Sequence, residues 1–402
     1  MDCTAVKPEV LMTEKLFYQD PYLFEFDAAV RACRPEKEGY AITLDRTAFY
    51  PEGGGQLTDL GFLNDIPVTF VKEIGEEIYH FCPAPLEVGT QVHGRVDAPR
   101  RFDLMQQHSG EHIASGLICA AFHCDNVGFH ISDPFVIVDY NASISWEELK
   151  EIELAANRYI WENRPMEVHY PSEEALHQME FRSKKELKDL SGDIRVVEFP
   201  GADICACCGT HVKFSGEVGL IKFISCVPHR GGVRIEMLSG GRALRYVDAV
   251  QSQNHQISVA LSAKETETAA AVERLKKEAL SLKERLAVLE TRAIEEKAAV
   301  LAGKGPALLL EENMSVDSVR RLADAVMQSC GGFCAVLSDC GEDGIRYAMG
   351  QEGGDLRELV KALNEAFSGR GGGKPHFVQG TLRGDVQKAA AFIREALGVE
   401  NA

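Results

Sequence analysis

The sequence predicts an α+β protein made of several successive parts, and three observations support this prediction. Short apolar segments divided by turn residues fill residues 9 to 90, which is typical of a β-rich part. A mixed stretch with metal-ligating residue types at helical spacing follows. A charged segment with a heptad pattern then precedes alternating strands and helices. We expect a small β-barrel over residues 1–90, a zinc-binding α+β domain over 91–250, a helical coiled-coil spacer over 251–302 and a compact α/β domain over 303–402.

Composition narrows the class of protein. With 402 residues, 45% of them hydrophobic, the chain can bury more than one core. It shows no N-terminal signal-like apolar region and no run of about 18 apolar residues, so we expect a cytoplasmic protein without a membrane segment. Its 12 cysteines are therefore expected to be reduced thiols. The net charge of −18 argues against broad, nonspecific nucleic-acid binding but not against a local basic surface.

The N-terminal stretch is expected to form a small closed β-barrel. Apolar or alternating segments at residues 40–44, 68–71 and 78–81 are typical of strands, and turn residues separate them. Closure would leave no exposed strand edge. The glycines at residues 53–55 allow a tight turn or a close approach to a ligand. Without further context, a plain hairpin loop would be the better interpretation of this glycine run.

Two motifs in the mixed stretch offer metal ligands. His108 and His112 lie four residues apart ahead of an apolar helical run, so both imidazoles project from one helix face. Cys207 and His211 have the same spacing, in a segment where Gly209 favours a turn or a helix start. Either pair alone is weak evidence for a metal. Together they offer three nitrogens and one sulfur, a set that suits tetrahedral zinc.

These motifs resemble a known family. Residues 107–112 and 207–212 are similar to the two metal-binding motifs of the alanyl-tRNA synthetase editing domain and of its free-standing relatives, the AlaX trans-editing proteins. Residues 44–56 resemble the family's D-x-T-x-F-Y-P-x-x-G-G-Q segment, and residues 233–236 resemble its V-R-I-E strand. Residues 368–377 resemble the glycine-rich loop of the synthetase C-terminal domain, which also occurs in DHH phosphodiesterases and in long AlaX proteins. The resemblance thus covers nearly the whole chain.

The resemblance implies an ATP-independent, zinc-dependent aminoacyl-tRNA deacylase of the carboxylic ester hydrolase class. Its substrate would be alanine tRNA mischarged with serine or glycine, and the sequence does not choose between these amino acids. Zinc would polarise the acyl carbonyl or activate water, or it would mainly hold the aminoacyl end, because four protein ligands complete a tetrahedron. The expected ligands are His108, His112, Cys207 and His211. Cys205 and Cys208 remain alternatives, since the usual C-G-G-T-H motif here is C-C-G-T-H.

The resemblance also implies roles for residues around the metal. Thr47 would contact the amino-acid moiety and sense a serine hydroxyl. Asn126 stands where the family often has a pocket-lining glutamine. Glu111 is either a general base or, as we slightly favour, a solvated helix residue. The loop that faces the pocket would bind substrate through Gly53, Gly54, Gly55 and Gln56.

The spacer over residues 251–302 is expected to pair with another helix, and the domain over residues 303–402 is expected to bind tRNA. Between residues 260 and 300, apolar residues recur in steps of three and four, which predicts pairing with another helix in the chain or across a homodimer, or one long solvated helix. In the glycine-rich loop, Arg370, Gly372 and Lys374 would offer N–H groups and charge to phosphate. The sequence contains no aminoacylation module ahead of the barrel and no D-H-H motif, which favours a free-standing hydrolase.

Two alternatives belong to other classes. Residues 108–112 also fit H-x-x-E-H, the inverted signature of zinc peptidases, but the cysteine-containing second motif and the barrel argue against it. The other alternative is a non-catalytic tRNA-binding protein in which zinc is purely structural. The acidic net charge mildly favours this version.

Overall fold

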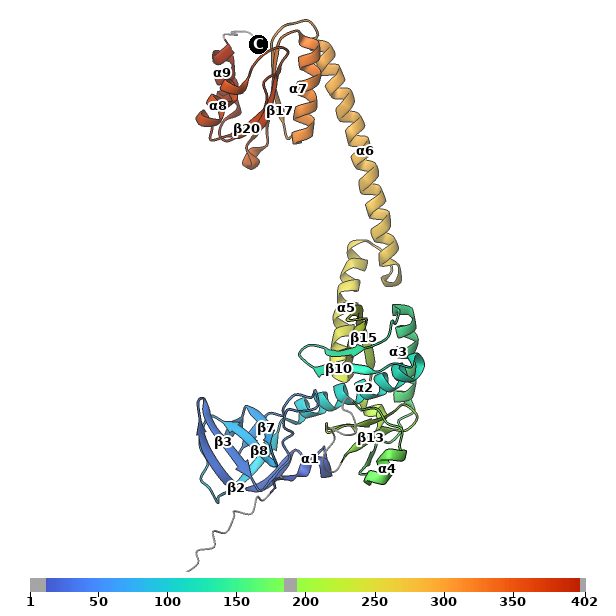
Figure 1. Ribbon diagram of the computed structural model, residues 1–402. Coiled ribbons are helices and arrows are strands. Elements are labelled where there is room, and N and C mark those ends of the chain that lie inside the picture. Colours follow the sequence, from blue (N-terminus) through green and yellow to red (C-terminus); the bar gives the residue numbers. More distant parts are fainter. Residues whose placement is uncertain (1–11, 184–193, 398–402) are drawn as a thin grey trace, which may run out of the picture. The chain divides into compact units, whose positions relative to one another are not determined.

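The computed structural model describes residues 12–183 and 194–397, which contain both strands and helices, as Figure 1 shows. The predicted α+β class is therefore confirmed. The chain divides into two compact units, residues 1–256 and 257–402. The finer division into four parts stays a prediction. None of the helices in the described ranges is long and apolar enough to cross a membrane.

A seven-stranded antiparallel sheet occupies the start of the first unit, in the order β6-β5-β9-β2-β3-β8-β7. The strand β2 pairs with β9 through its first half and with β3 through its second, with a register shift in between. Because β6 and β7 stand at the two ends of this order, closure into a barrel stays a prediction. The strands are β2 (Glu25–Glu36), β3 (Gly39–Leu44), β5 (Gly61–Leu63), β6 (Ile66–Val68), β7 (Phe70–Ile74), β8 (Glu77–Cys82) and β9 (Gln91–Val96).

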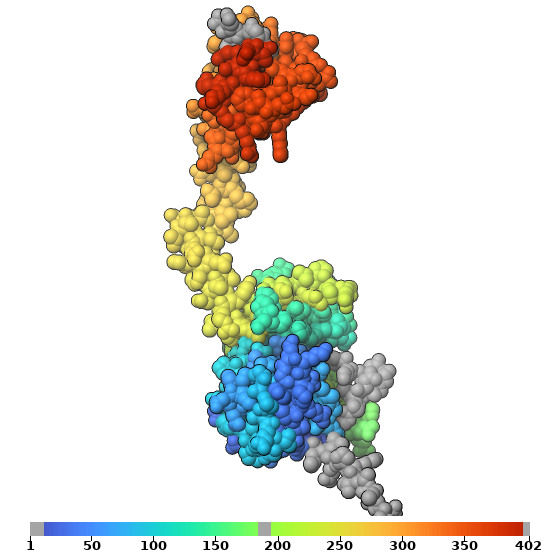
Figure 2. Space-filling view, turned by 90° about the vertical axis from the view of Figure 1, so that its left-hand side faces the viewer, coloured from blue at the N-terminus to red at the C-terminus, as the bar shows by residue number. Residues whose placement is uncertain are grey.

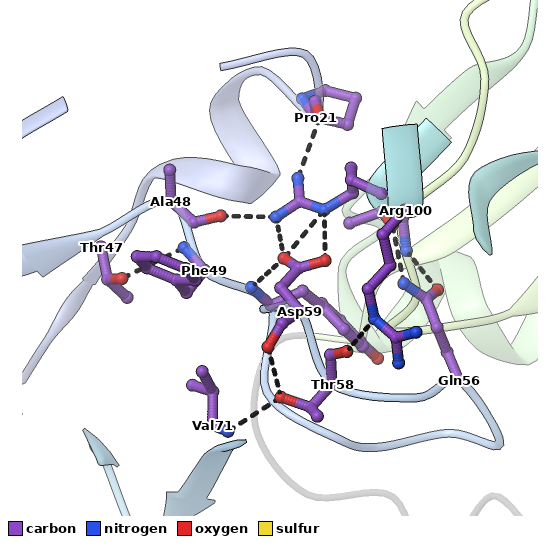
Figure 3. Close-up of polar contacts among 12 residues, drawn as sticks. Pro21, Thr47, Ala48, Phe49, Gln56, Thr58, Asp59, Val71 and Arg100 are labelled. Carbon is purple, nitrogen blue, oxygen red and sulfur yellow. Dashed lines mark hydrogen bonds and ion pairs between the residues drawn. The ribbon is translucent and has the colours of Figure 1, made fainter. Parts of the chain in front are cut away.

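A long irregular loop leads from β4 (Arg46–Thr47), which pairs in parallel with β1 (Glu14–Lys15), to β5. A buried ion pair ties this loop to helix α2 (Ala98–Phe122), and Figure 3 shows its carboxylate, Asp59, among backbone groups of the loop. The guanidinium of Arg101 donates from Nε to both carboxylate oxygens of Asp59 at 3.0 and 2.9 Å and from Nη2 to the carbonyl of Ala48 at 2.6 Å. Asp59 also accepts the Tyr50 N–H at 2.6 Å. The contacts thus fix the loop on both sides of residue 50.

A second layer of helix and sheet makes up the rest of the first unit. Helices α2 and α3 (Trp146–Trp161) pack against a four-stranded sheet of order β10-β11-β16-β15. A capping box begins α3, because the Ser145 hydroxyl accepts the Glu148 N–H and the Glu148 carboxylate accepts the Ser145 N–H. The strands are β10 (Asn126–Ile131), β11 (Val136–Tyr140), β15 (Ile221–His229) and β16 (Gly232–Ser239).

A small sheet of order β12-β13-β14 brings the second metal motif to α2. Its strands are β12 (Glu167–His169), β13 (Val196–Phe199) and β14 (Asp203–Ala206), and α4 (Glu173–Gln178) lies between β12 and β13 in the chain. Gly116 of α2 makes the approach possible, since a Cβ there would stand 2.1 Å from the carbonyl oxygen of Ala202. In the space-filling view of Figure 2, the blue residues of the N-terminal sheet lie against the cyan and teal residues that follow them in the chain. The helix α5 (Gly240–Ala260) follows β16.

The second unit holds a five-stranded sheet of order β17-β18-β19-β21-β20, with three helices packed on it and α6 (Thr268–Leu301) packed on α7. Only β17 and β18 are parallel neighbours. The helices are α7 (Val316–Cys330), α8 (Arg357–Ala366) and α9 (Val386–Leu397), and the strands are β17 (Ala307–Glu312), β18 (Phe333–Asp339), β19 (Ile345–Gln351), β20 (Arg370–Lys374) and β21 (Phe377–Leu382).

The prediction of a glycine-rich loop in this unit is wrong. Its residues 370–374 form the edge strand β20, which pairs with β21. Its glycines serve close packing. A Cβ at Gly371 would stand 2.2 Å from the hydroxyl of Tyr347, and one at Gly373 would stand 2.3 Å from the carbonyl oxygen of Phe377. Glycine therefore lets β20 lie flat against β21.

The helix α6 leaves its predicted heptad seam largely uncovered. Leu282, Leu286 and Leu289 are 54, 57 and 61% exposed. Near the end of the same helix, Ile294 and Ala298 are buried in a core shared with α7. The described residues thus show α6 as one long helix whose middle is solvated within a single chain.

Candidate metal centre

The four side chains expected to bind zinc converge on one point. Nε2 of His108 and Nε2 of His211 lie 3.5 and 3.4 Å from Sγ of Cys207. The ligand atoms of these residues and of His112 all lie within 4.8 Å of one another. Tetrahedral zinc, with bonds of about 2.0 Å to nitrogen and 2.3 Å to sulfur, would separate nitrogen from sulfur by about 3.5 Å. The donor set therefore fits zinc in its chemistry and its spacing.

Two elements supply these ligands. His108 and His112 project from adjacent turns of α2, and Cys207 and His211 come from the segment that follows β14. That segment passes directly over His108, since a Cβ at Gly209 would stand 2.1 Å from Cε1 of the imidazole. Arg195 holds the turn by donating from Nη1 to the carbonyls of Cys207 and Gly209 at 2.8 and 3.0 Å.

The second nitrogen of each imidazole contacts a further protein group. Nδ1 of His108 lies 2.8 Å from Oε1 of Gln56, and Nδ1 of His211 lies 3.1 Å from the hydroxyl oxygen of Ser109. Nδ1 of His112 lies 2.9 Å from Oδ2 of Asp203. Such outer contacts orient metal-binding imidazoles and leave Nε2 for the metal.

Charge in this buried site is balanced by close pairs. Burial would raise the pKa of the Cys207 thiol, but the three surrounding imidazoles outweigh burial and hold this pKa well below its ordinary value. Burial also acts to raise the pKa of Asp203, yet His112 and Arg182 lower it. Arg182 donates to Asp203 from Nε and Nη2 at 2.6 and 2.8 Å. Cys207 is therefore suited to bind a metal as thiolate.

The neighbouring cysteines are in different positions. Burial raises the pKa of the Cys205 and Cys208 thiols. Cys205 groups with His112 and Asp203, and Sγ of Cys208 lies 3.9 Å from the hydroxyl of Tyr50. Among the described residues, Cys207 is the thiol that groups with the three imidazoles.

Glu111 is not the solvated residue that we favoured, because it is only 1% exposed. Its Oε1 accepts from the hydroxyl of Ser115 and from the side-chain amide of Asn126, each at 2.6 Å. Asn126 also lines a cavity of about 460 Å³ together with Arg182 and Cys205. The structure thus joins Glu111 by a hydrogen bond to Asn126, which itself lines the cavity.

Thr47 lies on β4 and is fully buried. Its hydroxyl lies 2.8 Å from Nε2 of His80 and accepts the N–H of Phe49 at 3.1 Å. This burial argues against direct contact between the Thr47 hydroxyl and a bound amino acid.

The glycine loop reaches the metal motifs by a close approach. Gly54 and Gly55 have φ of +61° and +84°, a region that favours glycine. A Cβ at Gly54 would stand 2.9 Å from Sγ of Cys208, and one at Gly55 would stand 2.5 Å from the ring of Phe129. That ring stacks on His108 at 5.0 Å between centroids. Gly53 forms a bridge with Gln56, which places the Gln56 side chain on the metal motifs.

Sequence reasoning missed several groups around the metal. Ser109 was not predicted, although its position inside the first motif was a signal that could have identified it. Asp203, Phe129 and Arg182 are distant in sequence from the residues that they contact, and no local pattern distinguishes them. The remaining candidates, Arg370, Gly372 and Lys374, lie on the exposed strand β20 of the second unit.

Comparison with known proteins adds three family matches. The family described as tRNA synthetases class II (A) matches residues 12–100, and the threonyl and alanyl tRNA synthetase second additional domain matches residues 194–236. The DHHA1 domain matches residues 297–398.

Individual proteins are similar over longer stretches. The alanyl-tRNA editing protein AlaX-L of Pyrococcus horikoshii is 28% identical over 92% of this chain and 95% of its own length. The alanyl-tRNA editing protein Aarsd1 of Danio rerio is 30% identical over 69% of this chain and 71% of its own length. The alanine–tRNA ligase of Archaeoglobus fulgidus is 31% identical over 94% of this chain, which spans 43% of that enzyme.

Proposed function

Because the chain belongs to the family of alanyl-tRNA editing proteins, we propose that it is a hydrolase of mischarged alanine tRNA. Its substrate is the ester that joins serine or glycine to the terminal adenosine. The observation that carries the proposal is the convergence of His108, His112, Cys207 and His211, whose imidazoles are each oriented by a second protein contact. These four residues would hold zinc.

Zinc and the residues of the chain would have separate roles in ester hydrolysis. Zinc held by these four residues would supply a Lewis acid that polarises the acyl carbonyl, or it would hold the aminoacyl end. Because four protein ligands would complete the tetrahedral coordination of zinc, a residue of the chain must bind the attacking water. Glu111 takes the proton of this water, whose oxygen forms the new bond to the acyl carbon. As the ester bond breaks, the proton passes to the departing ribose oxygen.

Asn126 orients Glu111 in this scheme. Its amide nitrogen lies 2.6 Å from Oε1 of Glu111, and the Ser115 hydroxyl donates to the same oxygen. These two donors fix the orientation of the Glu111 carboxylate. The aminoacyl end enters the cavity that Asn126 lines.

Three further roles follow from the exposure and burial of side chains. Thr47 acts on serine selectivity through the position of the loop that follows it, since its own hydroxyl is buried against His80. Arg370 and Lys374, exposed at the two ends of β20, offer positive charge to tRNA phosphate. The exposed seam of α6 pairs two copies of the chain.

Deacylation of seryl-, glycyl- and alanyl-charged alanine tRNA tests the proposal. We expect the wild-type protein to release serine or glycine and to spare alanine, and we expect His108→Ala to lose both activity and zinc. A zinc-loaded wild-type protein that hydrolyses none of the three esters would support a non-catalytic tRNA-binding protein instead.

A further inference from the structure

Gln56 lies at the end of the glycine loop and contacts the metal motifs with its whole side-chain amide. The residue is 1% exposed. Oε1 accepts the backbone N–H of Thr210 at 3.1 Å and lies 2.8 Å from Nδ1 of His108. Nε2 donates to the hydroxyl of Thr210 at 2.9 Å. One amide therefore joins a zinc ligand from α2 to the segment that carries the other two ligand residues, Cys207 and His211.

These contacts determine which nitrogen of His108 carries the proton. The backbone N–H of Thr210 can only donate, so the amide atom that faces it must be the oxygen. The same oxygen faces Nδ1 of His108, and an amide oxygen can only accept. Nδ1 must then carry the proton, which leaves the lone pair of Nε2 directed at Cys207 and the metal position.

The other imidazoles are held by different groups. Asp203 can also only accept when it is charged, and it faces Nδ1 of His112. Ser109 accepts the N–H of Val212 and can either donate to or accept from Nδ1 of His211, so it does not select a tautomer by itself. Among Gln56, Asp203 and Ser109, Gln56 is the uncharged group that fixes the tautomer of its imidazole.

The loop that delivers Gln56 is held at several points. Gly53 and Gln56 exchange backbone hydrogen bonds of 3.1 and 3.0 Å, and the carbonyl of Gly55 accepts the N–H of Ile131 at 2.9 Å. The Asp59 and Arg101 pair anchors the same loop to the start of α2, the helix that bears His108. The amide thus meets the imidazole from a fixed backbone, which lowers the entropy lost on forming the contact.

We propose that Gln56 is a positioning residue of the metal centre, which orients His108 and couples zinc binding to the N-terminal loop. This inference replaces our expectation that Gln56 binds substrate, and it rests on the proposed zinc site. Side chains that hold the second nitrogen of a metal-binding imidazole typically contribute about 10- to 100-fold to metal affinity.

Zinc affinity, measured by competition with a chromophoric chelator, tests the inference. Gln56→Leu removes the acceptor and is expected to bind zinc about 10- to 100-fold more weakly than wild type. Gln56→Glu keeps an oxygen toward His108, and the Thr210 hydroxyl can rotate to donate to it, so its affinity should stay within a few-fold of wild type. The visible spectrum of the cobalt-substituted protein should change in Gln56→Leu and be restored in Gln56→Glu.

Gln107 provides a matched control. It is a fully buried glutamine next to His108, but its amide exchanges hydrogen bonds of 2.9 and 2.8 Å with the backbone of Ser239. Gln107→Ala should lower the melting temperature and leave the zinc affinity of the folded protein near that of wild type.

The possible outcomes separate this inference from the proposed function. A folded Gln56→Leu with wild-type zinc affinity would overturn the positioning role and leave the zinc site intact. If Gln56→Leu does not fold, Thr210→Val removes the hydroxyl that accepts from Gln56 and should weaken zinc binding several-fold; unchanged affinity there overturns the role equally. A wild-type protein that holds no zinc would instead reject the metal centre itself.

Discussion

The hydroxyl of Thr47 on β4 lies 2.8 Å from Nε2 of His80, which lies on β8 of the N-terminal sheet. Nδ1 of His80 lies 3.1 Å from the carbonyl of Ile42, which can only accept, so Nδ1 carries the proton and Nε2 accepts from Thr47. The threonine hydroxyl in turn accepts the N–H of Phe49. This chain of three hydrogen bonds connects the start of the metal-contacting loop to the core of the sheet.

Replacing Thr47 tests whether this connection matters for selectivity. Thr47→Val leaves Nε2 of His80 and the N–H of Phe49 without their partner, so we expect the free energy of unfolding to fall by about 1 to 3 kcal/mol. Thr47→Ser, which keeps the hydroxyl, should lose less. If the effect runs through the loop, Thr47→Val slows seryl- and glycyl-tRNA hydrolysis together. A selective loss of the seryl substrate would establish direct sensing instead.

The buried His80 predicts acid sensitivity of the first unit. Burial lowers the pKa of His80 from 6.5 to about 4, so below pH 6.5 the unfolded chain binds a proton that the folded chain does not. The stabilisation by neutral His80 is complete above pH 6.5 and is lost as the pH falls toward 4. Its full loss amounts to about 3 kcal/mol.

Denaturant unfolding between pH 7.5 and 4.5 measures this term. Over the acidic part of this range, wild type should lose about 1.4 kcal/mol per pH unit more than His80→Gln, which cannot titrate at this position. Parallel pH profiles for the two proteins would show that His80 is protonated in the folded state at its ordinary pKa. Comparing zinc-saturated samples keeps the metal ligands from contributing to the difference.

The sequence predicted the parts of this site that lie in short motifs and not the contacts between them. The spacing of His108 and His112 on a helix and the Cys207 motif were sufficient to anticipate that the side chains of His108, His112, Cys207 and His211 group together. The burial of Glu111 was missed, because its partner Asn126 reaches it only when β10 folds back on α2.

The same limit applies to glycine. The run at 371–373 has the composition of a flexible loop, and only the position of Tyr347 and β21 beside it explains why the segment is a strand. Composition indicates how many conformations a backbone can adopt, but it does not show which neighbouring residues pack against that backbone.

The Asp59 and Arg101 pair should be essential to the first unit, since both side chains are fully buried. Arg101→Met leaves the carboxylate of Asp59 buried without its charge partner, and we expect a loss of about 3 to 5 kcal/mol in the free energy of unfolding. Arg101→Lys should rescue little, because a single ammonium cannot reach Asp59, Ala48 and Pro21 at once. The double variant with Asp59→Leu should recover part of the loss in urea unfolding. Equal losses in the single and double variants would contradict a charge-based cost.

Removing zinc should destabilise the first unit alone. Metal bound to the folded state at about 1,000 times its Kd stabilises that state by about 4 kcal/mol. A chelator should therefore lower the melting temperature of the first unit, and added zinc should restore this temperature. The second unit contains none of the four proposed ligands, so its transition provides the internal control. A chelator that leaves both transitions unchanged would contradict a folded-state zinc site.

The seam of α6 should decide the oligomeric state. Leu282 and Leu286 are 54 and 57% exposed and lie on the heptad positions, whereas Leu280 is 59% exposed and lies one residue off the seam. Pairing would bury the seam leucines and leave Leu280 in solvent, because only the a and d positions of a heptad face the partner helix. We expect wild type and Leu280→Lys to sediment as dimers, and Leu282→Lys with Leu286→Lys to sediment as a monomer with unchanged zinc content. A monomeric wild type at all concentrations, or equal behaviour of both variants, would assign α6 to a solvated spacer.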